Sequence, residues 1–160
     1  MSFDPATFEA EIALKLIPTE RLPWIAQDAL EAGFEGPHIL RMAILEPDAG
    51  WGIDQALPPM MDELGCRSIS SKEAALRLAR QCAQRILQSV EDPLLSLPYF
   101  RQLMEEAGYI DELIELGFFD DEDIFLSDDP QERRKRCRED LEELLSPELR
   151  QRRRAERKAA

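Results

Sequence analysis

The chain has 160 residues, of which 44% are hydrophobic, and its formal net charge is −13 at pH 7. This apolar content excludes a disordered polyelectrolyte, and the length suits one domain with a core of its own. The chain contains no run of about 18 apolar residues and no basic segment followed by an apolar one at its start, so the sequence predicts neither a membrane span nor a secretory signal. Cys66, Cys82 and Cys137 are too widely spaced for a disulfide framework or a ligand pair, which favours a cytoplasmic protein.

Proline and glycine divide the first half of the chain into segments with helical periodicity. We expect helices over residues 5–17, 20–32, 37–45 and 53–64. Pro18 ends the first of them, Gly33 follows the second, and Pro37 begins the third. In the third helix we expect the apolar side chains to point inward; these are Ile39, Leu40, Ala43 and Ile44.

The second half of the chain continues in the same way. Ser70-x-x-Glu73 is a capping-box pattern, and it predicts a long amphipathic helix to about Val90. Further helices are expected over residues 97–107, 109–116 and 129–145. The sequence therefore predicts an all-α fold, namely a single-domain bundle or stack of about seven short antiparallel helices over residues 1–146. A basic C-terminal tail, residues 147–160, can extend as a frayed helix.

The negative charge is concentrated in one stretch, since residues 103–132 contain 12 acidic and no basic residues. The tail, in contrast, contains six basic and two acidic residues. A concentrated negative field can steer a cationic partner, whereas nucleic acid requires a basic surface that only the tail supplies. We expect a basic protein partner, such as a toxin or nuclease, and no nucleic-acid contact beyond a weak one through the tail.

Within the acidic stretch, large apolar residues flank four consecutive acids at residues 120–123. In one interpretation the aromatic residues fix a loop onto the core while the acids stay in water. In the other, the acids and one or two exposed aromatics form an interface. The predicted partner-binding residues are Glu105, Glu106, Asp111, Glu112, Glu115, Phe119, Asp120, Asp121, Glu122, Asp123, Phe125 and Asp128. Arg77, Arg80 and Arg85 are candidates for an intramolecular partner of this stretch.

The sequence does not indicate catalysis. His38 is the only histidine, and the chain has no G-x-S-x-G, H-E-x-x-H or glycine-rich phosphate loop. A calcium loop that begins at Asp121 fails, because Phe125 and Leu126 stand where an oxygen ligand and a glycine are needed. We therefore expect no catalytic residue, no metal and no cofactor. A hydrolase or metal enzyme remains the third hypothesis, and stoichiometric bound metal would revive it.

Residues 74–145 carry a family resemblance. An amphipathic helix with the sequence AALRLARQCAQRILQ is followed by Asp92-Pro93, by a helix that leads to an acidic turn, and by a D-P-x-E motif at residues 129–132. This order resembles small acidic all-helical bacterial proteins, some of which are similar to the immunity proteins that accompany secreted toxins. The resemblance implies an inhibitor that has no chemistry of its own.

Two hypotheses for the function follow. The first is an immunity or inhibitor-type protein, whose acidic stretch blocks a basic partner surface by mimicking phosphate. The alternative is a helical adaptor or assembly protein, in which an apolar helix face forms the interface. A homo-oligomer is compatible with the second hypothesis.

Overall fold

The computed structural model describes residues 2–122 and 128–160, and every regular element within these ranges is a helix. The predicted all-α class is therefore confirmed. The described residues form nine α-helices and four short 3-10 helices, where about seven helices were expected. Within the same ranges, no helix is long and apolar enough to cross a membrane.

The chain divides into two compact units, residues 1–74 (unit 1) and residues 75–160 (unit 2). This differs from the single domain predicted to end at residue 146. Helical periodicity shows which face of each helix is apolar, but it does not show which helices share a core. The basic tail is part of unit 2 and is no separate segment.

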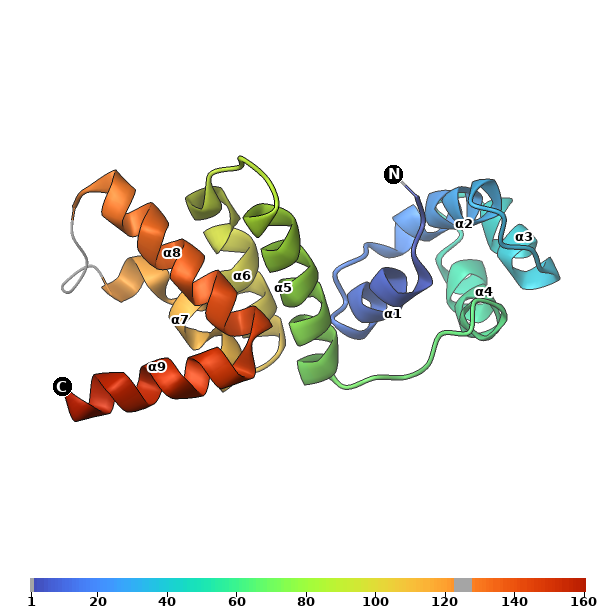
Figure 1. The fold of residues 1–160 in the computed structure, drawn as a ribbon. Coiled ribbons are helices and arrows are strands. Elements are labelled where there is room, and N and C mark those ends of the chain that lie inside the picture. Colours follow the sequence, from blue (N-terminus) through green and yellow to red (C-terminus); the bar gives the residue numbers. More distant parts are fainter. Residues whose placement is uncertain (1, 123–127) are drawn as a thin grey trace. The chain divides into compact units, whose positions relative to one another are not determined.

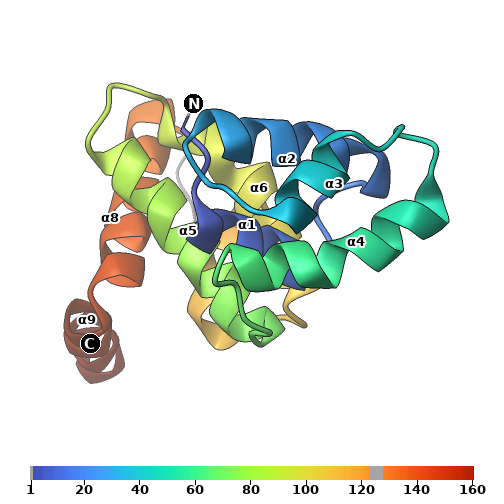
Figure 2. The ribbon, with the colours of Figure 1, turned by 90° about the vertical axis from the view of Figure 1, so that its right-hand side faces the viewer.

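Unit 1 contains four α-helices and one short 3-10 helix. They are α1 (Pro5–Ala13), η1 (Thr19–Arg21), α2 (Leu22–Glu31), α3 (Pro37–Ala43) and α4 (Gly50–Glu63). In Figure 2, α2 and α3 lie side by side, and α4 runs below them. Their inner faces form one core that includes Phe8, Leu22, Ile39, Met42, Ile53 and Met60.

Helix α1 is shorter than expected. The carboxylate of Asp4 accepts hydrogen bonds from the backbone N–H groups of Ala6 and Thr7, and Pro5 occupies the first helical position. The helix ends at Ala13, before the proline that was expected to end it, and Lys15 adopts a positive φ of 55°. A left-handed residue at a helix end is a common stop signal, although glycine is its usual carrier.

A side chain from another helix caps the start of α3. Both carboxylate oxygens of Glu63, at the end of α4, accept from the backbone N–H of His38, at 2.9 and 3.0 Å, and one also accepts from that of Ile39 at 2.8 Å. A Cβ atom at Gly36 would overlap this carboxylate, so glycine precedes the helix for steric reasons. The contact joins the first turn of α3 to the last turn of α4.

Glu63→Ala is expected to lower the free energy of unfolding by about 1–2 kcal/mol, because two backbone N–H groups lose a charged acceptor. Denaturant unfolding, followed by circular dichroism, measures this loss. Glu63→Gln keeps one side-chain oxygen as an acceptor and is expected to lose less. Equal stability of the alanine variant and the wild type would contradict the capping role.

Unit 2 contains the remaining helices. They are α5 (Ser71–Leu87), whose first turn precedes the unit boundary, η2 (Pro93–Ser96), α6 (Leu97–Glu106), η3 (Asp111–Leu113), α7 (Ile114–Gly117), η4 (Phe119–Glu122), α8 (Pro130–Leu145) and α9 (Pro147–Ala159). The predicted cap of α5 is confirmed, since the Glu73 N–H donates to Ser70 Oγ at 3.0 Å. Asp129 caps α8 by accepting from the Gln131 N–H.

Side chains from α5, α6, η3, α7, η4 and α8 are buried in unit 2. Phe100, Leu103, Leu113 and Leu141 are fully buried there. Gly117 is required in α7, because a Cβ atom at this position would overlap the sulfur of Met104. The acidic stretch of the sequence thus surrounds part of a packed core.

The basic tail forms the regular helix α9, which lies beneath α7 and α8 in Figure 1. Ser146 separates it from α8 with an extended backbone, φ −128° and ψ 95°, and its Oγ accepts from the Leu149 N–H. No residue of α9 is buried, and the structure describes all of them. The helix therefore owes its position to polar contacts.

Candidate functional site

The predicted acidic residues are distributed over several short helices of unit 2. Glu105 and Glu106 end α6, Asp111 and Glu112 belong to η3, Glu115 lies in α7, Asp120, Asp121 and Glu122 lie in η4, and Asp128 precedes α8. Asp123 and Phe125 lie outside the described residues. The acidic residues of this stretch therefore lie on four helical elements, α6, η3, α7 and η4, and not on one loop.

Arginines of the protein itself bind part of this stretch. Arg101 lies 3.1 Å from Glu105 and 3.4 Å from Asp121, and Arg133 lies 2.8 Å from Asp120. The hydrogen bond to Glu105 and the charge of Asp121 raise the pKa of Arg101. These pairs neutralise carboxylates that the sequence analysis assigned to partner binding.

Helix α9 binds two further predicted residues. Arg150 lies 3.4 Å from Asp111 and 3.2 Å from Glu115, and Arg154 lies 3.2 and 3.1 Å from the same two carboxylates. Hydrogen bonds to Glu115 and Asp111 raise the pKa of Arg154. Of the arginines predicted as internal partners, Arg80 donates to the Leu144 carbonyl and Arg85 pairs with Glu91.

These contacts correct the prediction of an open acidic patch. Several of the predicted carboxylates pair with internal arginines, namely Glu105, Asp111, Glu115, Asp120 and Asp121. Glu106 and Asp128 are exposed, and Glu112 is half-buried. Phe119 is only 2% exposed, so its ring belongs to the core and not to a partner-binding surface. Its burial follows from its place between α7 and the acidic turn, where an apolar ring closes the core.

A second pair of carboxylates lies at the contact between α8 and α9. Glu143 is only 3% exposed, and its carboxylate forms ion pairs with Arg153 at 3.4 Å and with Arg157 at 3.0 Å. The carboxylate of Glu142 forms an ion pair with Arg153 at 3.4 Å. The sequence prediction did not include these two acids, because they lie beyond the acidic run. The spacing of the tail arginines, which places them on one helix face, is the signal in the sequence that could have indicated this contact.

Asp140 is a buried carboxylate in the same helix. It is 5% exposed, and its Oδ1 makes no hydrogen bond with any described residue, although Arg136 Nε lies 3.3 Å away. Burial raises the pKa of Asp140 to about 7; the charges of Glu143 and Glu115 add to this rise, and Arg136 and Arg157 oppose it. The group thus titrates near neutrality.

Unit 1 exposes large apolar side chains that the sequence reading did not place in a site. Trp24 is 54% exposed, Leu40 54%, Ile44 74% and Trp51 77%. We call these four residues the apolar surface. Leu40 and Ile44 were expected to point inward, but α3 buries Ile39, Met42 and Ala43 instead. A seven-residue helix with apolar residues on more than one face cannot bury all of them, and the pattern alone did not choose between the faces.

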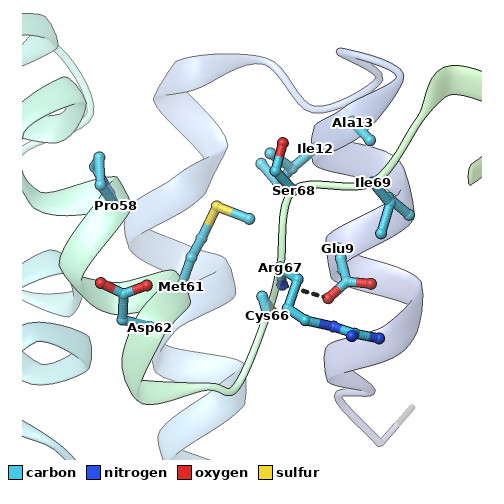
Figure 3. A pocket seen from close by; sticks show the side chains of 10 residues that line it. All are labelled: Glu9, Ile12, Ala13, Pro58, Met61, Asp62, Cys66, Arg67, Ser68 and Ile69. Carbon is cyan, nitrogen blue, oxygen red and sulfur yellow. Dashed lines mark hydrogen bonds between the residues drawn. The ribbon is translucent and has the colours of Figure 1, made fainter.

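Unit 1 also contains a pocket with a volume of about 380 Å³ between α1, α4 and the segment that follows α4. In Figure 3 the carboxylate of Glu9 points to the backbone of Arg67, whose N–H donates to it at 2.6 Å, and Met61 extends toward the pocket. Glu9 is 7% exposed, so its charge holds the segment after α4 in place. The arrangement explains the local structure of this segment.

The described residues provide no cluster of metal ligands. Within residues 2–122 and 128–160, no three His, Cys, Asp or Glu side chains gather in a way that could hold a metal ion. All three cysteines are buried, and burial raises the pKa of Cys137 to about 12 and also raises that of Cys82. Thiols with raised pKa values are poor nucleophiles at neutral pH.

No known protein family, curated protein or solved structure matches this chain. The resemblance to immunity-type proteins therefore stays a prediction. The geometry of the chain's own residues is the basis for assigning a function. Two features of that geometry bear on binding, namely the apolar surface of unit 1 and the arginine-bound carboxylates of unit 2.

Proposed function

We propose that the chain is a non-catalytic helical binding protein of the adaptor or assembly kind, which engages a protein partner through the apolar surface of unit 1. The observation that carries this proposal is the exposure of four large apolar side chains, two of them tryptophans, on three consecutive helices. Tryptophan is enriched among the residues that dominate binding energy at interfaces. Large apolar residues exposed to water on neighbouring helices are typical of a binding surface.

The contacts within unit 1 place the helices that carry these residues beside one another, since α3 packs on both α2 and α4. Gln27 Nε2 donates to the carbonyl of Ala43 at 3.0 Å, so the end of α3 lies beside α2. Trp24 is one helical turn before Gln27, and Ile44 directly follows Ala43. Leu40 precedes Ile44 by four residues and therefore shares its face. Trp51 occupies the first turn of α4, which packs on α3.

Charged residues on the same elements as the apolar surface indicate the chemistry of its partner. The exposed charged residues of α2, α3, α4 and the turns between them are mostly acidic, with Arg41 as the basic exception: Asp28, Glu31, Glu35, Glu46, Asp48, Asp54 and Asp62. Interfaces combine an apolar centre with a polar rim, and complementary rim charges speed association. A partner with an apolar pocket and a basic rim fits this surface.

The expected test result is loss of the partner from a Trp24→Ser/Trp51→Ser variant. Replacing two aromatic anchors is expected to weaken binding about tenfold or more. The wild type and the variant are used as baits in a native lysate, and the captured protein is measured by quantitative mass spectrometry. The matched control is Val90→Ser/Leu95→Ser, which replaces two exposed apolar residues of unit 2. A partner that both double variants retain equally would contradict the proposal.

Tryptophan emission supplies an independent measurement, because Trp24 and Trp51 are the only tryptophans of the chain. When a partner covers these exposed rings, their emission shifts to shorter wavelength. The same shift in the purified protein at rising concentration, together with light scattering, would indicate that the partner is a second copy.

A second candidate function is inhibition of a basic protein by the carboxylates of unit 2. The observation that favours it is that these carboxylates already bind guanidinium groups in good geometry, at distances from 2.8 to 3.4 Å. A partner would have to compete with the internal arginines. In the capture experiment, a partner that high salt removes but the tryptophan variant retains would support this candidate.

A further inference from the structure

A second pocket of unit 1, which we call the α1–α2 pocket, lies between the N-terminal residues, α1 and α2. Its volume is about 410 Å³, which is within the range of pockets that hold ligands in proteins. Apolar and acidic side chains share its lining. The apolar ones are Phe3, Phe8 and Ile25, and the acidic ones are Asp4, Glu11 and Asp28.

Aromatic packing fixes the apolar wall of this pocket. The ring centre of Phe3 lies 5.7 Å from that of Phe8 and 5.6 Å from that of Phe34. Phe8 belongs to the core of unit 1, whereas Phe3 and Ile25 are half-buried and leave part of their surface to the pocket. The wall is therefore formed before a ligand arrives, and a preformed wall lowers the ordering cost of binding.

Glu11 places a carboxylate without a partner in this pocket. Its side chain is half-buried, and among the described residues it accepts no hydrogen bond and forms no ion pair. Burial raises the pKa of Glu11, and the charge of Arg21 opposes this rise. Arg21 lines the same pocket but is exposed and does not reach ion-pair distance of Glu11. The carboxylate thus loses part of its hydration and gains no donor from the protein in return.

The remaining charges of the pocket favour a cation. Three of its lining residues are acidic and one is basic, which leaves an excess of two negative charges. Asp4 is engaged as the cap of α1, whereas the side chain of Asp28 is exposed and has no hydrogen bond or ion pair with the described residues. A carboxylate beside aromatic rings suits a guanidinium group on an apolar stem, because arginine pairs with carboxylates and also stacks on aromatic faces.

The pocket and the apolar surface meet on α2. Arg21, Trp24, Ile25 and Asp28 follow the spacing i, i+3, i+4 and i+7, so they share one face of this helix. We propose that the α1–α2 pocket receives an arginine side chain of the protein that binds the apolar surface, with the guanidinium group on Glu11 and the stem against the apolar wall. The inference rests on the proposed function, and it names a basic group of the partner and the place where this group binds.

The test uses the full chain and N-acetyl-arginine amide as the probe, followed in amide NMR spectra. A single side chain of this kind is expected to bind with a Kd of roughly 1–10 mM, since it forms one charged pair and a small apolar contact. The shifted signals are expected within residues 2–11 and 21–28. N-acetyl-citrulline amide has nearly the same shape without the charge, and it is expected to bind at least about tenfold more weakly.

A charge substitution makes the test specific to this pocket. Glu11→Gln preserves the size of the side chain, and it is expected to weaken binding of the arginine probe at least about fivefold. The matched control is Glu35→Gln, which removes the same charge from an exposed position of unit 1 outside the pocket and should leave the affinity unchanged. Circular dichroism verifies that both variants are folded.

Three results would overturn this inference: equal affinity of the arginine and citrulline probes, unchanged binding to Glu11→Gln, and shifts spread over the acidic residues of the whole chain. The capture experiment separates its failure from that of the proposed function. A partner that the Trp24→Ser/Trp51→Ser bait loses but the Glu11→Gln bait retains fully would leave the proposed function standing without the arginine. A partner that the tryptophan variant retains would refute the proposed function itself.

Discussion

Asp140→Asn is expected to stabilise the protein at pH 8 and to remove a decline in stability that the wild type shows as the pH rises toward neutrality. Burial raises the pKa of Asp140 from 3.8 to about 7, with contributions in the same direction from Glu143 and Glu115 and opposite ones from Arg136 and Arg157. Between these two values the folded protein keeps a proton that the unfolded chain has released. Stability therefore falls as the pH rises through this window.

The size of the effect follows from the linkage between protonation and folding. One proton contributes at most about 1.4 kcal/mol to the free energy of unfolding for each pH unit in the window. Asparagine resembles the neutral carboxyl group and does not ionise, so this component of the pH dependence disappears in the variant. Denaturant unfolding at pH 5 and pH 8 measures it, and the difference between wild type and variant should be larger at pH 8.

Asp92→Asn is the matched control, because its pH dependence has the opposite sign. A hydrogen bond from Arg134 lowers the pKa of Asp92, with a further contribution from the Leu94 N–H. Asp92 therefore contributes stability above its ordinary pKa, and that stability is lost as the pH falls through the lowered value. Identical pH profiles for the wild type and Asp140→Asn would show that Asp140 is ionised in the folded protein at neutral pH.

Local signals in the sequence determined where most helices begin. Pro5, Pro37 and Pro130 each occupy the first helical position, and Asp4 and Asp129 cap two of these helices as side-chain acceptors. Such signals involve residues close in the chain, so one sequence suffices to read them. The division into two units depends on contacts between whole helices, and periodicity does not encode which helices meet.

The acidic site shows the same limit. Its charge concentration was evident in the sequence, but neutralisation by α9 depends on Arg150 returning to Asp111 across 39 residues. Each interaction was nevertheless within reach of sequence reasoning. An arginine stripe at helical spacing in the tail and an acidic pair four residues apart, Asp111 and Glu115, are complementary patterns. Considering the tail as a structured helix would have connected them.

The position of the aromatic residues was undecided in the sequence, since Phe118 and Phe119 both border the acidic run. Although the two residues are adjacent in the chain, the structure places their rings in different surroundings. Phe119 is 2% exposed, with the Arg133 guanidinium 5.6 Å from its ring centre, whereas Phe118 is half-buried and stacks with Tyr109 at 6.1 Å. Neighbouring residues in a helical turn point in different directions, so only the local geometry reveals which ring enters the core.

Phe119→Ala is expected to lower the free energy of unfolding by about 3–5 kcal/mol, because it removes a fully buried ring and leaves a cavity in the core of unit 2. Phe118→Ala is the matched control in the adjacent position; it is expected to cost roughly 1 kcal/mol, since part of its ring is already in water. Denaturant unfolding followed by far-ultraviolet circular dichroism measures both.

If Phe119 were a partner-binding residue, as its place in the sequence indicated, its removal would leave the unfolding curve unchanged and weaken only partner capture. Large destabilisation with Phe119→Ala and a small effect with Phe118→Ala would instead show that Phe119 is part of the core of unit 2 and that Phe118 contributes little to it.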